Sequence, residues 1–293
     1  MSHHQTHPGR SQRLIAIGAL CTAPLLIGCS KDLGLAGGNF DQSSNSIMTV
    51  FAPPSPVEAV QWATDPYDAG KRQYGILLLA GAPWGGESPY VKMYAIAAND
   101  EDSAVRTAAI RALSLHGSVE HAPQLIKALT TGDPLTRREA ARALQRIHSE
   151  NAIEPLLDAI NPSNEDEYEI RREAAVALGQ YPTTRVVLSL ISALSDRRLG
   201  VNDAARQSLQ TITGQDFAYE IDDWVEWSSD TDDLFASGTP YEYPVFARDK
   251  TWYESLMFWY EPPNEISGRP IGAPPIQLSD SNDADTDDNT QTN

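Results

Sequence analysis

One pattern recurs along this chain, and its clearest copy reads Val105-Arg106-Thr107-Ala108-Ala109-Ile110-Arg111-Ala112-Leu113. Further copies align at residues 136–144, 170–178 and 201–209, and an earlier, weaker copy occupies residues 72–79. The second positions of the copies, residues 72, 106, 137, 171 and 202, are separated by 34, 31, 34 and 31 residues. A period of this length combined with helical patterning is typical of a solenoid.

Within each copy the small or apolar residues follow the second position by three, four and seven residues, which places them on one face of a helix. Alanines at matching positions of that face would allow neighbouring helices to approach closely; they are Ala109, Ala140, Ala174 and Ala205. A second apolar helix is predicted before each copy, over residues 91–98, 122–129, 152–160 and 186–194. The repeating unit is therefore a pair of helices.

The residues between the predicted helices agree with this interpretation. Gly117 and Gly179 stand where a helix often ends on a left-handed residue. Acids suited to helix N-termini stand at or near the start of each following helix; they are Asp102, Asp133, Glu167 and Asp196. Because one helix pair cannot bury its apolar face alone, the pairs must stack. The sequence predicts an all-α fold, a right-handed α-solenoid.

The motif Asp…Val-Arg-x-x-Ala-(Ala/Ile)-x-Ala-Leu resembles HEAT-like repeats of the group related to phycobilin-lyase repeats, and the resemblance covers residues 57–228. It implies that the arginines and the acids before them form polar ladders between neighbouring repeats. The arginines at the matching positions are Arg72, Arg106, Arg137 and Arg171. Asn202 replaces arginine in the last copy, as expected of a terminal repeat.

The N-terminal residues predict a cell-envelope address. Arg10 and Arg13 precede an apolar run over residues 14–28, whose helix would rise about 22 Å and fall short of a bilayer core of ~30 Å. A positive start and a short apolar run are typical of a secretory signal peptide, here residues 1–28. The run ends in Leu26-Ile27-Gly28-Cys29, which resembles the lipobox of bacterial lipoproteins.

The lipobox resemblance implies cleavage before Cys29 and acyl chains, palmitate among them, on its sulfur and amine. Ser30 then favours the outer membrane over the inner, since Asp would stand there in retained lipoproteins. Residues 29–56, rich in Gly, Ser and Asn, read as a flexible tether. The alternative is a soluble secreted protein in which the cysteine occurs by chance.

Composition narrows the function classes. The formal net charge is −18 and no basic face is visible, which argues against binding to nucleic acid. Only two cysteines are present, and Cys21 would be lost with the signal peptide, so thiol chemistry is not expected. Only His116, His121 and His148 follow the signal, and no catalytic set, metal site or cofactor motif is found. We therefore expect no enzyme activity and no cofactor.

Aromatic residues gather in the C-terminal region, which is divided into an extension over residues 229–275 and an acidic tail over residues 276–293 that we expect to be disordered. The tryptophans of interest are Trp224, Trp227, Trp252 and Trp259. One interpretation is a cap on the open end of the solenoid. The alternative is a platform for a ligand or a membrane contact, because Trp and Tyr suit both.

These features predict a membrane-anchored, non-enzymatic scaffold of the cell envelope that presents an extended concave solenoid surface to an unidentified protein or peptide. The alternative is an enzyme, or an accessory that handles a ligand or chromophore with the aromatic extension. A third hypothesis is a purely structural envelope component. A convergent cluster of polar and aromatic residues would favour the second hypothesis, and a groove along the helices would favour the first.

Overall fold

The computed structural model describes residues 55–257, 262 and 264–275. All of them belong to one compact unit, Pro53–Asn293. The predicted signal peptide, the lipobox with Cys29, almost all of the tether, Trp259 and the acidic tail lie outside the described residues.

The described residues form α-helices, short 3-10 helices and one isolated β-bridge between Ile147 and Ile271. The α-helices are α1 (Pro56–Ala63), α2 (Ala69–Ala80), α3 (Ser88–Ala97), α4 (Ser103–His116), α5 (Ala122–Thr131), α6 (Pro134–Ala143), α7 (Ile153–Ile160), α8 (Tyr168–Leu178), α9 (Thr184–Ala193), α10 (Leu199–Thr213) and α11 (Ile221–Asp230). The 3-10 helices are η2 (Val119–His121), η3 (Glu150–Ala152) and η4 (Glu254–Leu256). None of the helices within the described ranges has the length and apolar content needed to cross a bilayer.

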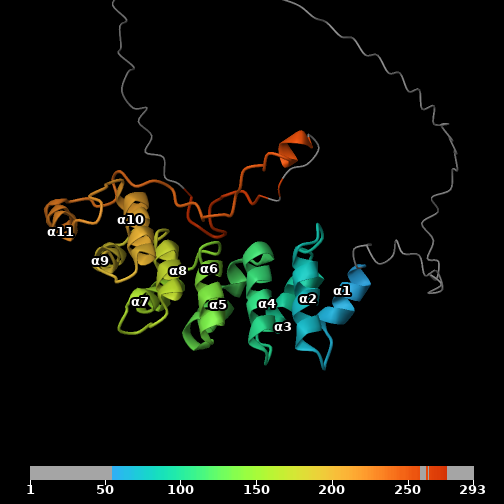
Figure 1. The fold of residues 1–293 in the computed structure, drawn as a ribbon. Helices are drawn as coiled ribbons and strands as arrows, with labels where there is room; N and C mark the ends of the chain where they lie inside the picture. The colour runs from blue at the N-terminus through green and yellow to red at the C-terminus, as the bar shows by residue number, and fades with distance from the viewer. Residues whose placement is uncertain (1–54, 258–261, 263, 276–293) are drawn as a thin grey trace, which may run out of the picture. The chain divides into compact units, whose positions relative to one another are not determined.

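Successive helices pair, and each pair stacks on the next (Figure 1). Helices α2, α4, α6, α8 and α10 pack side by side in one row, which we call the second-helix row. Helices α3, α5, α7 and α9 form the other row, and each packs against the second helix of its own pair. The all-α solenoid predicted from the repeat is confirmed.

The alanines of the repeat pattern allow the second helices to lie close together. Ala109, Ala140, Ala174 and Ala205 are completely buried. Their Cβ atoms leave little side chain between adjacent backbones, while larger residues such as Leu113 and Leu209 fill the space between the two rows. The prediction that these alanines face helix contacts is confirmed.

Acids begin two of the second helices as the sequence suggests. The Asp102 carboxylate accepts hydrogen bonds from the backbone N–H groups of Ala104 and Val105. Asp133 does the same at the start of α6, where it accepts from the N–H of Thr136. Glu167 stands at the N-cap of α8 without a capping bond, and Asp196 lies just before α10.

The expected left-handed residues at Gly117 and Gly179 are a wrong prediction. Gly117 is extended, with φ −74° and ψ 178°, and Gly179 is right-handed helical. Both are constrained by space, because a Cβ atom would lie 2.4 Å from the Leu113 carbonyl oxygen at Gly117 and 2.8 Å from Ser208 Oγ at Gly179. The left-handed helix end occurs instead at Gly214, with φ 72°, after α10.

Beyond α10 the chain forms α11 and then a long irregular segment. Helix α11 packs near α9 at the end of the solenoid and buries Trp224 completely. The chain then turns back along the second-helix row towards α6 (Figure 1). We call its described part within residues 239–272 the strap.

Candidate functional site: the arginine ladder and the second-helix face

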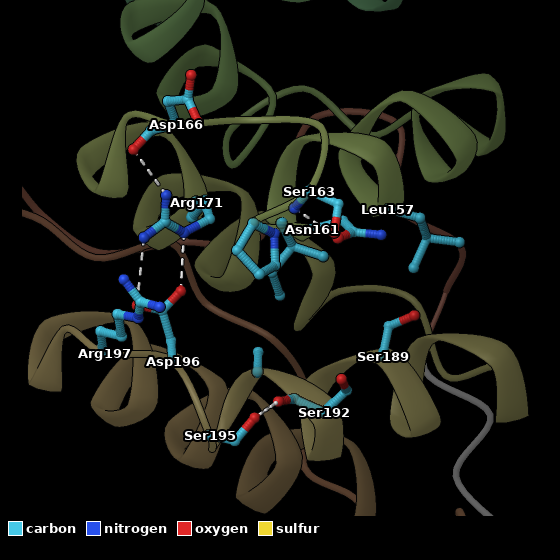
Figure 2. A pocket seen from close by; sticks show the side chains of 13 residues that line it. Leu157, Asn161, Ser163, Asp166, Arg171, Ser189, Ser192, Ser195, Asp196 and Arg197 are labelled. Carbon is cyan, nitrogen blue, oxygen red and sulfur yellow. Dashed lines mark hydrogen bonds and ion pairs between the residues drawn. The ribbon is translucent and has the colours of Figure 1, made fainter.

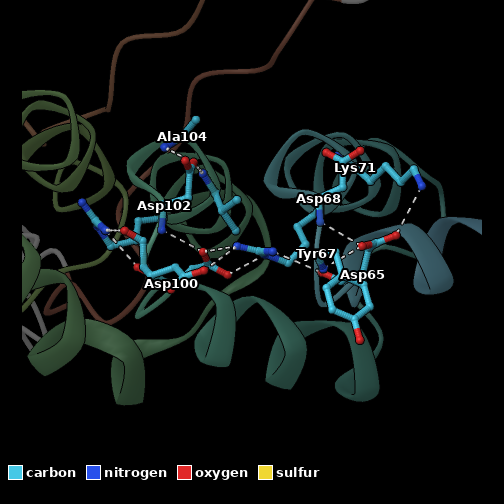
Figure 3. A network of polar contacts seen from close by, with 11 residues as sticks. Asp65, Tyr67, Asp68, Lys71, Asp100, Asp102 and Ala104 are labelled. Atoms are coloured by element: carbon cyan, nitrogen blue, oxygen red, sulfur yellow. Dashed lines mark hydrogen bonds and ion pairs between the residues drawn. The ribbon is translucent and has the colours of Figure 1, made fainter.

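The arginine at the second position of each repeat copy binds an acid of the following repeat. Three of the four pairs are bidentate, with N···O distances of 2.8–3.2 Å. The pairs are Arg72–Asp100, Arg106–Asp133, Arg137–Glu165 and Arg171–Asp196. Figure 3 shows the first part of this ladder, around Asp100 and Asp102. Each arginine thus joins two neighbouring repeats.

The same guanidinium groups also hold the loops of their own repeats. Nη1 of Arg171 donates to the backbone carbonyls of Glu165 and Asp166 at 2.8 and 2.9 Å, and Figure 2 shows Arg171 between Asp166 and Asp196. Nη1 of Arg106 donates in the same way to two carbonyls before α4. Backbone carbonyls of the loops before α4 and α8 are satisfied in this way.

Electrostatics lower the pKa values of three ladder acids, Asp100, Asp133 and Asp196. Burial alone would raise the pKa of Asp133, but hydrogen bonds from the Thr136 hydroxyl and the Arg106 guanidinium outweigh it and hold that pKa at about 2. The pKa values of Asp100 and Asp196 are lowered for the same reason, since hydrogen bonds from Arg72 and Arg171 outweigh desolvation. The Arg171–Asp196 pair is the most enclosed, with the two side chains 8% and 2% exposed.

The ladder ends at Asn202. Its side-chain amide donates to the Leu194 carbonyl at 2.7 Å, which reproduces the loop contact but reaches no further repeat. Asn202 Oδ1 is buried and has no hydrogen-bond partner among the described residues. The ladder arginines therefore hold neighbouring repeats together, and the fold already uses their donor groups.

A different set of arginines lies on the surface of the second-helix row, which we call the second-helix face. Three of them pair with acids of the same surface while their own side chains stay between one third and one half exposed; the pairs are Arg111–Glu139, Arg138–Glu169 and Arg172–Glu173. Arg142 is exposed between them. Sequence reasoning did not identify this set, because two of the three acids, Glu139 and Glu169, come beside their arginines only once the helices are side by side.

The strap lies across this face and makes its main contact at Arg146, just after α6. The Arg146 guanidinium stacks on the Tyr243 ring, 4.7 Å from the ring centroid, and forms an ion pair with Glu265. The N–H of Thr239 donates to the Thr211 carbonyl of α10 at 2.8 Å. Arg146 and Glu265 are 119 residues apart in sequence, so no local pattern could have found their contact.

A backbone pairing fixes the far end of the strap. Ile271 donates its N–H to the Arg146 carbonyl at 2.8 Å and accepts from the N–H of His148 at 2.9 Å. Gly272 follows with φ +85°, and a Cβ atom there would lie 2.4 Å from Cγ2 of Val119. Residues 271–272 therefore occupy a close-fitting slot formed by the residues after α6 and by η2.

The aromatic residues proposed as cap or platform divide between two environments. Trp224 is buried, with Phe217 edge-on at a ring-centroid distance of 4.9 Å and with Trp227 partly buried beside it. The capping interpretation needs only one of Trp252 and Trp259 to be buried beside Trp224, and it stays a prediction because Trp259 lies outside the described residues. Trp252 itself is 80% exposed and forms no part of a cap. The physical reason is that the strap turns back along the second-helix row, away from the end that α11 covers.

Exposed apolar side chains mark the part of the strap that projects from the face. They are Phe246, Trp252, Tyr253, Leu256 and Ile266. Trp252 and Tyr253 contact each other edge-to-face, with ring centroids 5.8 Å apart. This cluster, which we call the strap tip, keeps the platform interpretation open.

A cavity of about 640 Å³ opens between the ends of α7 and α9 (Figure 2). Serine and asparagine side chains line much of it, and one of them, Ser195, donates its hydroxyl to the backbone carbonyl of Ser192. The ionisable side chains that line this cavity are Asp166, Arg171, Asp196 and Arg197, and two of them, Arg171 and Asp196, form a pair of the ladder. In the described part of the chain no cluster of three or more His, Cys, Asp or Glu could hold a metal ion.

The histidines considered in the sequence make contacts within the solenoid. His116 Nε2 lies 2.7 Å from the Ala80 carbonyl oxygen of the preceding repeat. His148 Nδ1 lies 3.0 Å from Gln180 Oε1, and its ring packs on Tyr181. His121 bonds back to Ser118 in its own turn. Each of them is part of the connections between repeats.

Comparison with known proteins bears on the repeats. Residues 91–167 match the family model for HEAT repeats, and residues 170–196 match that of the PBS lyase HEAT-like repeat. A search of curated proteins gave no significant match.

Among solved structures, an engineered protein is 22% identical, with a TM-score of 0.41 and coverage of 53% of this chain and 77% of that one. A second engineered protein is 20% identical, with a TM-score of 0.44 and coverage of 59% and 87%. The YibA protein of E. coli is 17% identical, with a TM-score of 0.32 and coverage of 60% and 81%. The family matches span α4 to α9 and the ladder pairs Arg106–Asp133, Arg137–Glu165 and Arg171–Asp196, so this part of the chain is similar to HEAT-like repeats.

Proposed function

We propose that this protein is a membrane-anchored, non-enzymatic scaffold of the cell envelope that binds another protein through its HEAT-like solenoid. One observation carries the proposal: the ladder arginines are used by the fold, while the second-helix face keeps a separate row of partly exposed arginines. HEAT repeats generally mediate protein interactions, and a long, rigid row of helices offers an extended surface for contact.

The anchoring part of the proposal rests on the sequence Leu26-Ile27-Gly28-Cys29. Cys29 would carry the lipid, and the tether before Ser55 would let the solenoid stand away from the membrane. A chain of this length and composition has a mean reach of roughly 30 Å. Ser30 favours sorting to the outer membrane.

Metabolic labelling tests the anchor. Wild type and Cys21→Ala should incorporate labelled palmitate and partition into detergent, whereas Cys29→Ala should do neither, because only Cys29 would become the acylated N-terminus. Cys21→Ala is the matched control, since it lies in the apolar run of the signal. Equal labelling of Cys29→Ala and wild type would overturn the lipoprotein assignment, and membrane fractionation tests the sorting separately.

Crosslinking in intact membranes followed by mass spectrometry tests the scaffold role. A scaffold should give reproducible crosslinks from the second-helix face to one or a few proteins. Charge reversal at Arg142, which no described acid neutralises, should reduce them, while reversal at Arg185 on α9, in the other helix row, should not. Absence of specific crosslinks would favour a purely structural envelope component.

The strap tip supports a second candidate, a ligand- or chromophore-handling accessory. Its supporting observation is the exposure of Trp252 and Tyr253, whose rings contact each other. Aromatic surfaces of this kind bind flat apolar molecules. A change in Trp fluorescence on adding an envelope extract depleted of proteins, lost in Trp252→Ala, would favour this candidate over the scaffold.

A further inference from the structure

The strap contacts the second-helix face in the way an extended peptide contacts a receptor. Its backbone makes three hydrogen bonds to the solenoid, from Thr239 to Thr211 and in both directions between Ile271 and residues 146–148. Main-chain hydrogen bonds of this kind supply affinity when an extended segment is added to a folded partner. The face therefore has backbone groups suited to hold an extended chain.

Side chains add selectivity at one position. The Arg146 guanidinium contacts the aromatic ring of Tyr243 in the outgoing part of the strap and the carboxylate of Glu265 in its returning part. The Arg146 side chain is only 14% exposed under these two groups. A planar guanidinium can bind a carboxylate and stack on a ring at the same time. Arg146 is therefore the position at which the face selects a segment that carries an aromatic residue and an acid.

The strap is a loosely held occupant of this face. Phe246 is 68% exposed and Ile266 is 87% exposed. Much of the apolar surface of the strap therefore stays in contact with water and does not stabilise its docked position. The Tyr241 hydroxyl is buried beneath the strap without a hydrogen-bond partner among the described residues, and burial raises the pKa of this phenol. A buried, unpaired hydroxyl costs free energy that phenylalanine would avoid.

A segment with few buried contacts opens more readily than the packed helices beneath it. Opening the strap would free the Thr211 and Arg146 carbonyls, the His148 N–H and the Arg146 guanidinium together. These groups are aligned by α6, α8 and α10, whose positions the ladder fixes independently of the strap.

We propose that the second-helix face from Thr211 to His148 docks an extended segment of the partner protein that brings an aromatic ring and a carboxylate to Arg146, and that the strap occupies this site until it is displaced. The proposal rests on the scaffold function proposed above and specifies its partner chemistry. The strap presents the same two groups to Arg146 from within the chain, through Tyr243 and Glu265.

The test uses the full-length protein and a fluorescein-labelled synthetic peptide of residues 238–273 as the probe. Gly272→Ala in the protein should release the strap, because φ +85° is strained for alanine and its Cβ would collide with Val119. Gly81→Ala is the matched control, since a Cβ there finds ordinary space at 3.4 Å and lies in another connection. Hydrogen exchange at residues 239–243 and 264–272 reports release, and exchange at α8 reports an intact solenoid.

The released protein should bind the probe at least about ten-fold more tightly than wild type or Gly81→Ala, because a site that is open for a tenth of the time or less binds with a correspondingly reduced affinity. If exchange shows that Gly272→Ala leaves the strap docked, the double variant Tyr243→Ala/Glu265→Ala removes both Arg146 contacts and takes its place. Adding Arg146→Ala to the released protein should abolish the gain.

The chemistry of the probe is tested in parallel. A peptide with Tyr241→Phe should bind more tightly than the parent, and a peptide with Glu265→Lys should bind at least about ten-fold more weakly, since it meets Arg146 with a like charge. If the probe binds wild type and the released protein with equal affinity, the strap does not occupy the site, and that part of the proposal is overturned. The proposed docking surface is rejected if the probe does not bind a protein whose strap is released. It is also rejected if the Glu265→Lys peptide binds as tightly as the parent peptide.

This assay needs no cellular partner, so its failure is separate from failure of the scaffold function. Crosslinking that finds a partner at the second-helix face while the peptide results are negative would keep the scaffold and reject the strap as its competitor. Peptide binding without any crosslinked partner would show a peptide site and reject the scaffold role.

Discussion

The repeat body, from α1 to α11, and the strap are held in place by different forces, although both are tied to the same row of helices. The body buries apolar side chains in every layer, and arginine–acid pairs join the repeats as far as Asp196, just before α10. The strap buries few side chains and depends on backbone hydrogen bonds and on Arg146. The body should therefore determine global stability, and the strap should respond to local changes.

Aromatic residues show the same contrast within one stretch of sequence. Trp224 in α11 is fully buried against Phe217 and the helix core, whereas Trp252 in the strap is 80% exposed. Composition alone makes the two tryptophans equivalent. Their different positions decide what each contributes.

The largest expected effect is at Trp224. Trp224→Ala should lower the free energy of unfolding by about 3–5 kcal/mol, because it leaves a large cavity in the last layer. Trp252→Ala should change it by less than about 0.5 kcal/mol, as is usual for exposed positions. Urea denaturation followed by circular dichroism measures both, and a similar loss in the two variants would contradict the division between body and strap.

A second comparison contrasts two arginines. Arg171→Ala should lower the free energy of unfolding by about 3–5 kcal/mol, because it leaves the carboxylate of Asp196, only 2% exposed, without its charge partner. Arg146→Ala should cost about 1 kcal/mol or less in global unfolding, since its partner Glu265 is 44% exposed.

Urea denaturation measures the cost of both arginine variants, and hydrogen exchange locates it. Protection should fall across α8 and α10 in the first variant and only in the strap in the second. Loss of α6 protection in Arg146→Ala would mean that the strap supports the body.

A third prediction tests packing in the body. Ala174→Leu should destabilise by about 1–3 kcal/mol, because the alanine is completely buried between second helices and added methylene groups have no space. Ala247→Leu, at an exposed position of the strap, is the matched control and should be neutral. An unchanged thermal midpoint in Ala174→Leu would mean that the close approach of the second helices is not required.

The smallest expected effect is the dependence of thermal stability on pH. The folded-state pKa of Asp133 is about 2, below the ordinary value of 3.8, so its contribution is complete above about pH 4 and is lost as the pH falls towards 2. The lowered pKa values of Asp100 and Asp196 act in the same direction. The thermal midpoint should fall over this range, less steeply in Asp133→Asn.

The strap supplies none of these three acids, although the hydrogen bond from Arg248 holds the pKa of Glu254 in the strap at about 2. Gly272→Ala should therefore keep the part of the fall in thermal midpoint that the ladder acids cause. A flat midpoint in wild type between pH 4 and 2 would mean that the ladder pairs contribute no net stability through ionisation.

Periodic sequence was sufficient to predict the body. Apolar positions spaced by a helical turn, alanines at equivalent places and a period of 31 or 34 residues recur in every copy, so local patterning determines the helix pairs and their stacking. The ladder arginines could be named in advance from the resemblance of the repeat motif to HEAT-like repeats. Only their acid partners, such as Asp100 and Glu165, needed the structure.

Tertiary structure alone decided the rest. The course of the strap depends on contacts such as Arg146 with Glu265, which no period relates, and the conformations of Gly117 and Gly179 depend on space beside Leu113 and Ser208. The sequence by itself determined a repeat of helix pairs, because each repeat encodes the same local preferences. Which face the strap covers, and why Trp224 is buried while Trp252 is exposed, follow from contacts between distant segments that form only after the helices have stacked.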